Sequence, residues 1–137
     1  MINNGDTKKL REFLESRDFN FVEDTASGFL AALRSKNSIG EVINIGSGFE
    51  ISIGETVETI AKLMNTSIDI VSDEERLRPE NSEVERLCAC NKKAKELLEW
   101  QPSNYGIQGL EIGLSKTIDW FLNPENLIKY KSDIYNI

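Results

Sequence analysis

Apolar side chains along this chain recur at two spacings, one typical of helices and one typical of strands. Recurrence every three or four residues marks a helix with one apolar face. It predicts helices over residues 7–16, 24–34, 53–64, 91–99 and 107–121. Short apolar or alternating runs mark strands. They predict strands over residues 17–22, 41–45, 67–71 and 87–90. Because the two types of segment alternate, we expect a mixed α/β fold.

Local signals fix several ends of the predicted helices. Asp24 is expected to be the N-cap of the second helix, since its side chain accepts hydrogen bonds from free backbone N–H groups. Ser52 and Glu55 have the spacing of a capping box at the start of the third. The sequence Asn123-Pro124 is expected to end the last and longest helix, because proline disfavours a helical residue before it.

Size and charge limit the classes of partner. The chain has 137 residues, which suits one domain or one domain with a tail. Its net charge is −7, from 16 basic and 23 acidic side chains. An acidic surface repels phosphate backbones and anionic lipids, so we expect neither a nucleic-acid nor a membrane partner. The first ten residues form no apolar signal region, and no apolar run approaches ~18 residues, so a cytoplasmic location is expected.

The residue inventory excludes several catalytic and metal-binding arrangements. The chain contains no histidine, which removes Ser-His-Asp and Cys-His catalysis and histidine zinc sites. The two cysteines, Cys88 and Cys90, do not make a disulfide framework, and two thiolates alone do not complete a tetrahedral zinc site. We expect both to be buried or half-buried free thiols.

Two segments have features of anion-binding sites. Gly46-Ser47-Gly48 follows a predicted strand, but Ile51 stands where a dinucleotide fingerprint needs its third glycine. The segment is therefore interpreted as a plain turn. Residues 76–86 contain three arginines in an acidic chain. Guanidinium groups bind phosphate oxygens in a fork, although a solvated loop with compensating charges is an equally simple explanation.

Five blocks, in order, resemble the C-terminal, substrate-binding part of the extended short-chain dehydrogenase/reductase family, the NAD-dependent sugar-nucleotide epimerases and dehydratases. The blocks are Arg17-Asp-Phe-x-Phe-Val-Glu-Asp24, Val42-Ile-Asn-Ile-Gly-Ser-Gly48, Arg78-Pro79, Lys93-Ala-Lys-x-Leu-Leu-x-Trp-x-Pro102 and Gly109-Leu-x-x-Gly-Leu-x-Lys-Thr-Ile-x-Trp-Phe121. The run from Glu75 to Arg86 and the Lys131-Ser-Asp-Ile-Tyr tail most resemble the nucleotide-sugar 4,6-dehydratases that act on N-acetylhexosamine or related sugars. The resemblance implies a small α/β domain of short strands with packed helices, with the Rossmann domain absent from these residues.

The resemblance also implies a ligand and its site residues. In the family, the arginines that match Arg17 and Arg78 contact the diphosphate of a nucleotide sugar, and the asparagine that matches Asn44 lies at the nucleotide end. Arg86 and Glu75 are implied as neighbours of that site. The expected ligand is a UDP- or dTDP-linked sugar. Two guanidinium groups far apart in the chain are predicted to converge on its pyrophosphate.

Departures from the family pattern limit the chemistry. The sequence holds neither a G-x-x-G-x-x-G fingerprint nor a Tyr-x-x-x-Lys pair, so no catalytic residue and no bound cofactor are expected, although the family uses NAD. Cys90 replaces the family's capping aspartate, so Asn91 is expected to cap instead. Glu99 replaces a glycine, which is expected to cost that helix its left-handed stop.

We divide the chain into a segment outside the family motifs (residues 1–16), a substrate-binding domain (17–123) and a tail (124–137). Two functions follow. The first is a nucleotide-sugar-binding part of an epimerase or dehydratase, inactive alone. The second is a non-catalytic interaction or oligomerisation module that keeps the fold. In either case, apolar surface that a Rossmann domain would cover predicts a homo-oligomer or a partner that supplies that missing domain.

Overall fold

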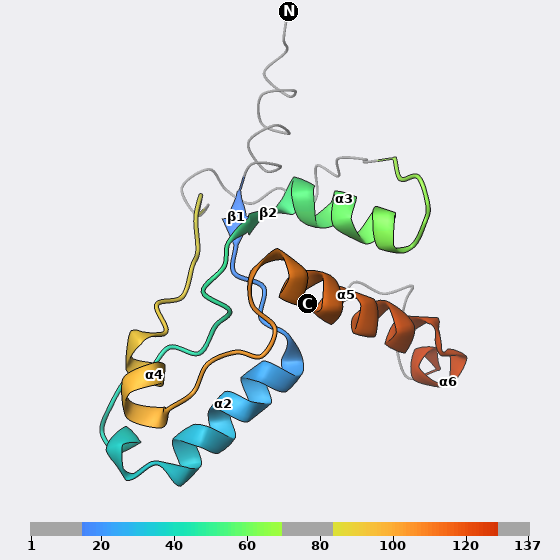
Figure 1. The fold of residues 1–137 in the computed structure, drawn as a ribbon. Helices are drawn as coiled ribbons and strands as arrows, with labels where there is room; N and C mark the ends of the chain where they lie inside the picture. Colours follow the sequence, from blue (N-terminus) through green and yellow to red (C-terminus); the bar gives the residue numbers. More distant parts are fainter. Residues whose placement is uncertain (1–14, 70–83, 129–137) are drawn as a thin grey trace, which may run out of the picture.

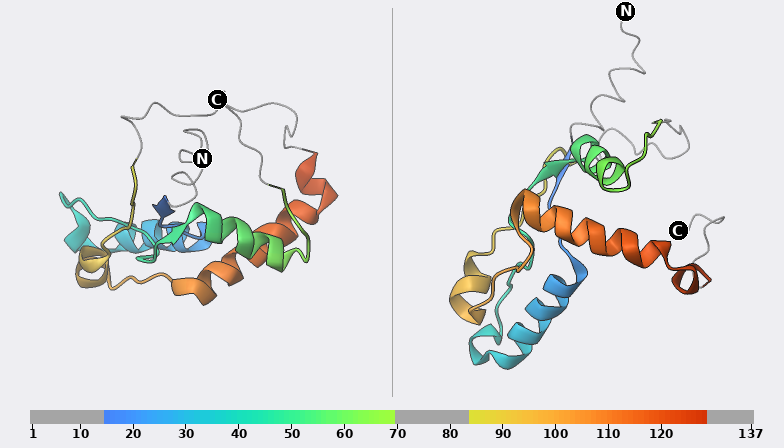
Figure 2. Two further views of the ribbon diagram at one scale, coloured as in Figure 1. Left: turned by 90° about the horizontal axis from the view of Figure 1, so that it is seen from above. Right: turned by 45° about the vertical axis from the view of Figure 1, so that its right-hand side comes forward.

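The computed structural model describes residues 15–69 and 84–128, and the fold below is that of these residues. The elements in chain order are β1 (Ser16–Arg17), α2 (Val22–Arg34), the 3-10 helix η1 (Lys36–Ser38), β2 (Ile51–Ser52), α3 (Ile53–Leu63), α4 (Lys92–Leu98), α5 (Gly106–Leu122) and α6 (Pro124–Leu127). Helix α3 packs on α5, and α2 packs on α4 (Figure 1). In both views of Figure 2, α4 lies toward one end of the molecule and α6 toward the other.

The described sheet is small and joins the two helix pairs. Strands β1 and β2 are antiparallel, with Ser16 opposite Ser52 and Arg17 opposite Ile51. On its other side, β1 makes a parallel bridge from Ser16 to Arg86. Three chain segments therefore meet at β1, which makes this strand the centre of the described structure.

The hydrophobic core lies between α2 and α4. Its buried members are Ala94, Leu98 and Trp100, and the indole N–H of Trp100 donates to the Ser27 hydroxyl at 2.8 Å. Partly buried apolar side chains pack around these three: Ala31, Ala32, Ile43, Ile45 and Leu97. The Lys93-to-Pro102 block is therefore a packing motif that holds α4 against α2.

The helices expected over residues 53–64 and 107–121 are confirmed. Ser52 caps α3 in a reciprocal capping box with Glu55, as the spacing predicts. Helix α5 ends at Leu122, and Pro124 then starts the short helix α6 with Asn123 as its N-cap. The helix predicted over residues 7–16 falls mostly outside the described residues.

The strand predictions are mostly wrong. In place of the strand expected over residues 17–22, the structure has the two-residue strand Ser16–Arg17, and Val22 is the first residue of α2. Residues 41–45, 67–69 and 87–90 form no strand in the structure. A strand needs a neighbouring chain segment to accept its backbone hydrogen bonds, and local apolar patterning does not supply one.

Two expected caps act differently. Phe21, and not Asp24, is the N-cap of α2. Asp24 lies in the first turn, only 2% exposed, and accepts hydrogen bonds from the backbone N–H groups of Ser103 and Asn104. Asn91 is the N-cap residue of α4 but makes no side-chain cap bond; its Nδ2 instead donates to the Gly46 carbonyl at 2.6 Å. Both side chains join distant segments instead of capping a helix.

The expected loss of the left-handed stop at α4 is wrong. Glu99 itself adopts the left-handed conformation, with φ 54° and ψ 29°, and its N–H donates to the Ala94 carbonyl. The turn is therefore kept, although a side chain with a Cβ is unfavourable there.

Replacing Glu99 with glycine is expected to stabilise the fold by about 0.5–1 kcal/mol. Glycine removes the Cβ penalty of the left-handed conformation, and part of this gain is offset by its larger unfolded-state entropy. Urea unfolding measures the difference. The matched control, Glu96→Gly within α4, is expected to lower stability by about 1 kcal/mol. A destabilised Glu99→Gly variant would contradict the assigned turn.

Candidate functional site

The candidate site lies around β1, where backbone hydrogen bonds join residues 15–17 to residues 85–87 on one side and to the start of α3 on the other. The Ser16 N–H donates to the Glu85 carbonyl at 3.0 Å, and the Leu87 N–H donates to the Ser16 carbonyl at 3.1 Å. On the other side, the Ile53 N–H donates to the Glu15 carbonyl at 2.9 Å. These bonds fix the positions from which Arg17 and Arg86 extend.

Arg17 is held by the chain's own oxygen atoms. Its guanidinium donates to the carbonyls of Ser16 at 2.9 Å and Val84 at 2.7 Å, and to the Glu15 carboxylate at 2.6 Å. The side chain is 21% exposed. The carboxylate that Arg17 contacts is therefore that of Glu15, and not that of the adjacent Asp18.

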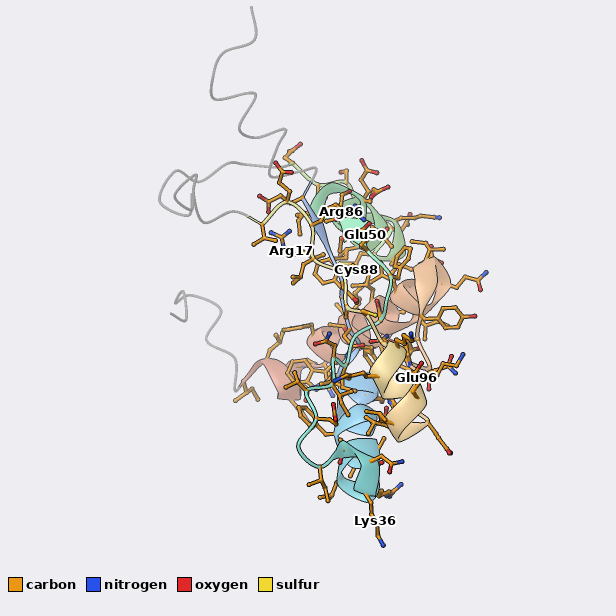
Figure 3. The ribbon with its side chains drawn as sticks, turned by 90° about the vertical axis from the view of Figure 1, so that its left-hand side faces the viewer. Arg17, Lys36, Glu50, Arg86, Cys88 and Glu96 are labelled. Carbon is orange, nitrogen blue, oxygen red and sulfur yellow. The ribbon has the colours of Figure 1, made fainter. Side chains whose placement is uncertain are left out.

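Arg86 is paired with Glu50, next to the bridge with Ser16. The Arg86 Nε donates to Glu50 Oε2 at 3.0 Å, and the Arg86 Nη2 donates to Glu50 Oε1. The Ser16 hydroxyl also donates to Glu50 Oε2, at 3.0 Å. The Arg86 side chain is nevertheless 75% exposed. Figure 3 shows Arg17 to one side of β1 and the Glu50–Arg86 pair to the other.

The hydrogen bonds from Arg86 and then Ser16 lower the pKa of Glu50 below its ordinary value of 4.5. A carboxyl whose pKa is lower in the folded state contributes stability above its unfolded pKa, and this contribution is lost as the pH falls through the folded value. The ionised Glu50 side chain therefore stabilises the folded state at neutral pH, and this stabilisation is lost in acid.

In the Glu50→Gln variant we expect part of the loss of stability below about pH 4.5 to disappear, because the glutamine does not titrate. Arg86→Ala should have the same effect, since it removes the main cause of the lowered pKa. Urea unfolding at several pH values measures this. An unchanged pH dependence in both variants would contradict the pairing.

The glycine turn is closed by a carboxylate. Asp18 accepts hydrogen bonds from the backbone N–H and hydroxyl of Ser47, from the Gly48 N–H at 3.0 Å and from the Ala89 N–H at 2.9 Å. A Cβ on Gly46 would lie well inside 3.0 Å of the Ala89 side chain. The N–H groups that a phosphate would need are therefore taken by Asp18, as the interpretation of this segment as a plain turn requires.

The predicted site residues are only partly brought together. Arg17 and Arg86 lie at the same small sheet. Asn44 is exposed, two residues before the turn that Asp18 holds. Arg78 and Glu75 lie outside the described residues, so the predicted convergence of Arg17 and Arg78 stays a prediction.

Both cysteines are exposed, so the expectation of buried or half-buried thiols is wrong. Desolvation by neighbouring atoms, and then the carboxylates of Asp18 and Glu50, raise the pKa of the Cys88 thiol above 9.0. A protonated thiol is a poor nucleophile and a poor metal ligand. Within residues 15–69 and 84–128, no cluster of metal-binding side chains occurs. None of the helices in this part of the chain has the length and apolar character needed to cross a membrane.

Sequence reasoning missed three residues that organise the site: Asp18, Glu50 and Asn91. Asp18 stands beside Arg17 in the first motif block, which was the available signal for its importance. Glu50 is 36 residues from Arg86, and no local pattern links the two. Asn91 was expected to cap its own helix, α4, whereas its side-chain amide donates a hydrogen bond to the Gly46 carbonyl in the glycine turn.

Comparison with known proteins defines the class to which this fold belongs. The family model described as GDP-mannose 4,6 dehydratase matches residues 1–111, a range that includes the first 16 residues. UDP-glucuronate 4-epimerase of Thermodesulfobacterium geofontis is 32% identical over 116 residues, which are 84% of this chain and 33% of that protein.

Solved structures agree with this match. UDP-glucuronic acid 4-epimerase of Bacillus cereus, a Y149F mutant with a fluorinated UDP-glucuronic acid and NAD, has a TM-score of 0.66 at 31% identity over 78% of this chain and 32% of its own. UDP-glucose 4-epimerase of Thermotoga maritima, solved with UDP-glucose, has a TM-score of 0.67 at 26% identity. The match covers 80% of this chain and 32% of that protein. The chain therefore belongs to the NAD-dependent sugar-nucleotide epimerases and 4,6-dehydratases of the extended short-chain dehydrogenase/reductase family, and spans about a third of the length of these relatives.

Proposed function

We propose that this chain binds a UDP- or dTDP-linked sugar through Arg17, Asn44, Arg78 and Arg86, and that it contributes no catalytic group and no cofactor site of its own. The observation that carries the proposal is the placement of Arg17 and Arg86 on adjoining segments at β1, in a fold shared with epimerases solved with UDP-sugars. A forked guanidinium matches the oxygens of a pyrophosphate.

The carboxylates beside the two arginines are expected to reduce the affinity of this chain for a pyrophosphate. Glu15 contacts Arg17, and Glu50 contacts Arg86, so a bound pyrophosphate must compete with both. Arg86 is the more available of the two, because its side chain is largely exposed while Arg17 also binds two backbone carbonyls. We therefore expect UDP to bind in the millimolar range.

Titration calorimetry with UDP tests the proposal. Arg86→Ala is expected to weaken binding about tenfold, equivalent to ~1.4 kcal/mol, because a charge-assisted contact is lost. Glu50→Gln is expected to tighten binding several-fold, since it frees Arg86 from a competing carboxylate. The control is Lys36→Ala in η1, far from the sheet (Figure 3). No heat at millimolar UDP from a folded chain, or equal weakening by the control, would refute the site.

A second candidate is a non-catalytic interaction or oligomerisation module. The observation that favours it is a run of exposed apolar side chains on α2, including Phe29 and Leu33. Such surface is normally covered in a stable protein. Light scattering at high protein concentration is expected to show self-association if this chain is an oligomerisation module, and a clean monomer would exclude that role.

A further inference from the structure

A groove with an apolar lining lies between the C-terminal parts of α3 and α5. Its volume is about 330 Å³. The two helices pack on each other but leave the groove open. Met64, the C-cap residue of α3, is 47% exposed, and Leu122, the last residue of α5, is 64% exposed. We call it the α3–α5 groove and define it by its apolar lining residues: Ile60, Met64, Leu114, Ile118, Phe121 and Leu122. Exposed apolar surface that is gathered in one place normally has a partner.

The described structure ends beside this groove. Helix α6 packs against α5, at the end of α5 that is far from the sheet (Figure 1). The Asn126 Nδ2 donates to the Trp120 carbonyl of α5 at 2.9 Å. The N–H of Ile128, the last described residue, donates to the Pro124 carbonyl at 3.2 Å. These bonds hold the end of α6 close to the last turn of α5, and that turn lines the groove.

The residues that follow Ile128 are long enough to reach the whole groove. Nine residues of this sequence, 129–137, come after it. An extended chain advances at most about 3.3–3.6 Å per residue, so these residues reach about 30 Å. The groove lining on α5, from Leu114 to Leu122, spans only about 12 Å of helix at about 1.5 Å per residue. Residues 129–137 can therefore enter the groove of their own chain without any rearrangement of α6.

The sequence of residues 129–137 also suits an apolar groove. Tyr130, Ile134 and Ile137 continue the spacing of Leu127 in α6, at intervals of three, four and three residues. This spacing places apolar side chains on one face of a helical segment. The polar residues between them include two lysines and one aspartate. Carboxylates prevail on the two helices of the groove, which carry Glu55, Glu58, Glu111 and Asp119 against Lys62 and Lys116. The charges are therefore complementary.

We propose that residues 129–137 dock in the α3–α5 groove of their own chain, with Tyr130, Ile134 and Ile137 against its apolar lining. An amphipathic segment that lays its apolar face in a hydrophobic groove is a common mode of peptide recognition. Helix α6 tethers the segment beside the groove and gives it an effective concentration in the millimolar range, so a weak contact suffices. The contact lies about 16 Å along α3 from the sheet that carries the candidate site. The inference is therefore independent of nucleotide-sugar binding.

Photo-crosslinking of the full chain tests the docking. The photoreactive residue p-benzoylphenylalanine takes the place of Tyr130, and mass spectrometry identifies the peptide to which it couples. Hydrogen exchange of the unlabelled chain reports separately on the amides of residues 129–137. Two variants disrupt the contact from opposite sides: Ile134→Asp in the docking segment and Leu122→Asp in the groove. The matched control is Ile112→Asp, because Ile112 is also an exposed apolar residue of α5 but does not line the groove.

We expect a crosslink within one chain, either to the peptide that contains Met64 or to residues 114–122. The amides of residues 129–137 should exchange at least tenfold more slowly than those of an unstructured chain. Both signals should be lost in Ile134→Asp and Leu122→Asp and kept in Ile112→Asp. If Leu122→Asp fails to fold, as judged by circular dichroism, Ile134→Asp alone decides. UDP binding should be the same in Ile134→Asp as in wild type.

Three results would overturn the inference. The first is fast exchange of residues 129–137 in the wild-type chain. The second is a crosslink outside the groove, or one that survives Ile134→Asp. The third is a crosslink between two chains, which would assign the groove to the same segment of a second copy.

Discussion

Asp18→Ala is expected to lower the free energy of unfolding by about 3 kcal/mol and, in a fold of this size, to bring the chain close to unfolding. The carboxylate is the common acceptor for donors on two distant segments, Ser47–Gly48 and Ala89. Removing the acceptor leaves the part-buried N–H groups of Ser47 and Ala89 without a partner, and each such group costs roughly 1–3 kcal/mol. The side chain thus joins β1 to the glycine turn and to the approach to α4.

Urea unfolding followed by circular dichroism measures this loss. Asp119→Ala, an exposed aspartate on α5, is the matched control and should stay within about 0.5 kcal/mol of wild type. Asp18→Asn keeps one acceptor oxygen, so its free energy of unfolding is expected to lie between those of Asp18→Ala and Asp119→Ala. If Asp18→Ala unfolds at the wild-type midpoint, the carboxylate does not hold the turn, and the first motif block has another purpose.

Gly109→Ala is expected to cost about 3 kcal/mol although alanine is the better helix former. A Cβ at position 109 would lie well inside 3.0 Å of the Asn104 backbone, which has little freedom to move. Asn104 is itself tied to the buried Asp24 carboxylate through its N–H at 3.1 Å and Nδ2 at 3.0 Å. The substitution therefore forces α5 away from the loop that anchors α2.

Gly113→Ala is the matched control for this effect, one turn further along α5. There the nearest atoms to the added Cβ would be those of the Phe21 side chain, the first at 3.2 Å, and a side chain adjusts more easily than backbone. The gain in helix propensity, up to about 1 kcal/mol, offsets that adjustment. Equal stability changes in the two variants would contradict the close approach at Gly109.

Helices were predictable from this sequence because their hydrogen bonds are local. The capping box of Ser52 and Glu55, and the periodicity of α5, are complete within the segments that form them. Strands were not, since residues 41–45 have strand composition but no paired neighbour in the described structure. The same limit applies to α2, whose apolar spacing correctly predicts a helix without telling which of its faces this chain buries.

The site was predictable only as far as the motif blocks extend. Arg17 and Arg86 lie on adjoining segments. The prediction was that Arg17 converges with Arg78, and Arg78 lies outside the described residues. The carboxylate partners of Arg17 and Arg86 were not predictable, because Glu50 meets Arg86 across 36 positions of sequence. Asp24 shows the opposite error, since its position suggested a local cap while its carboxylate binds a loop about 80 residues away.

We propose that these residues bind the nucleotide sugar, while the redox chemistry belongs to another part of the enzyme. A direct measurement is an assay of the purified chain with UDP-glucuronic acid and NAD, which follows epimer formation and retained NAD together with UDP binding. We predict that UDP binds, that no NAD is retained and that no sugar is converted. Turnover by this chain alone, or stable retention of NAD, would contradict the claim.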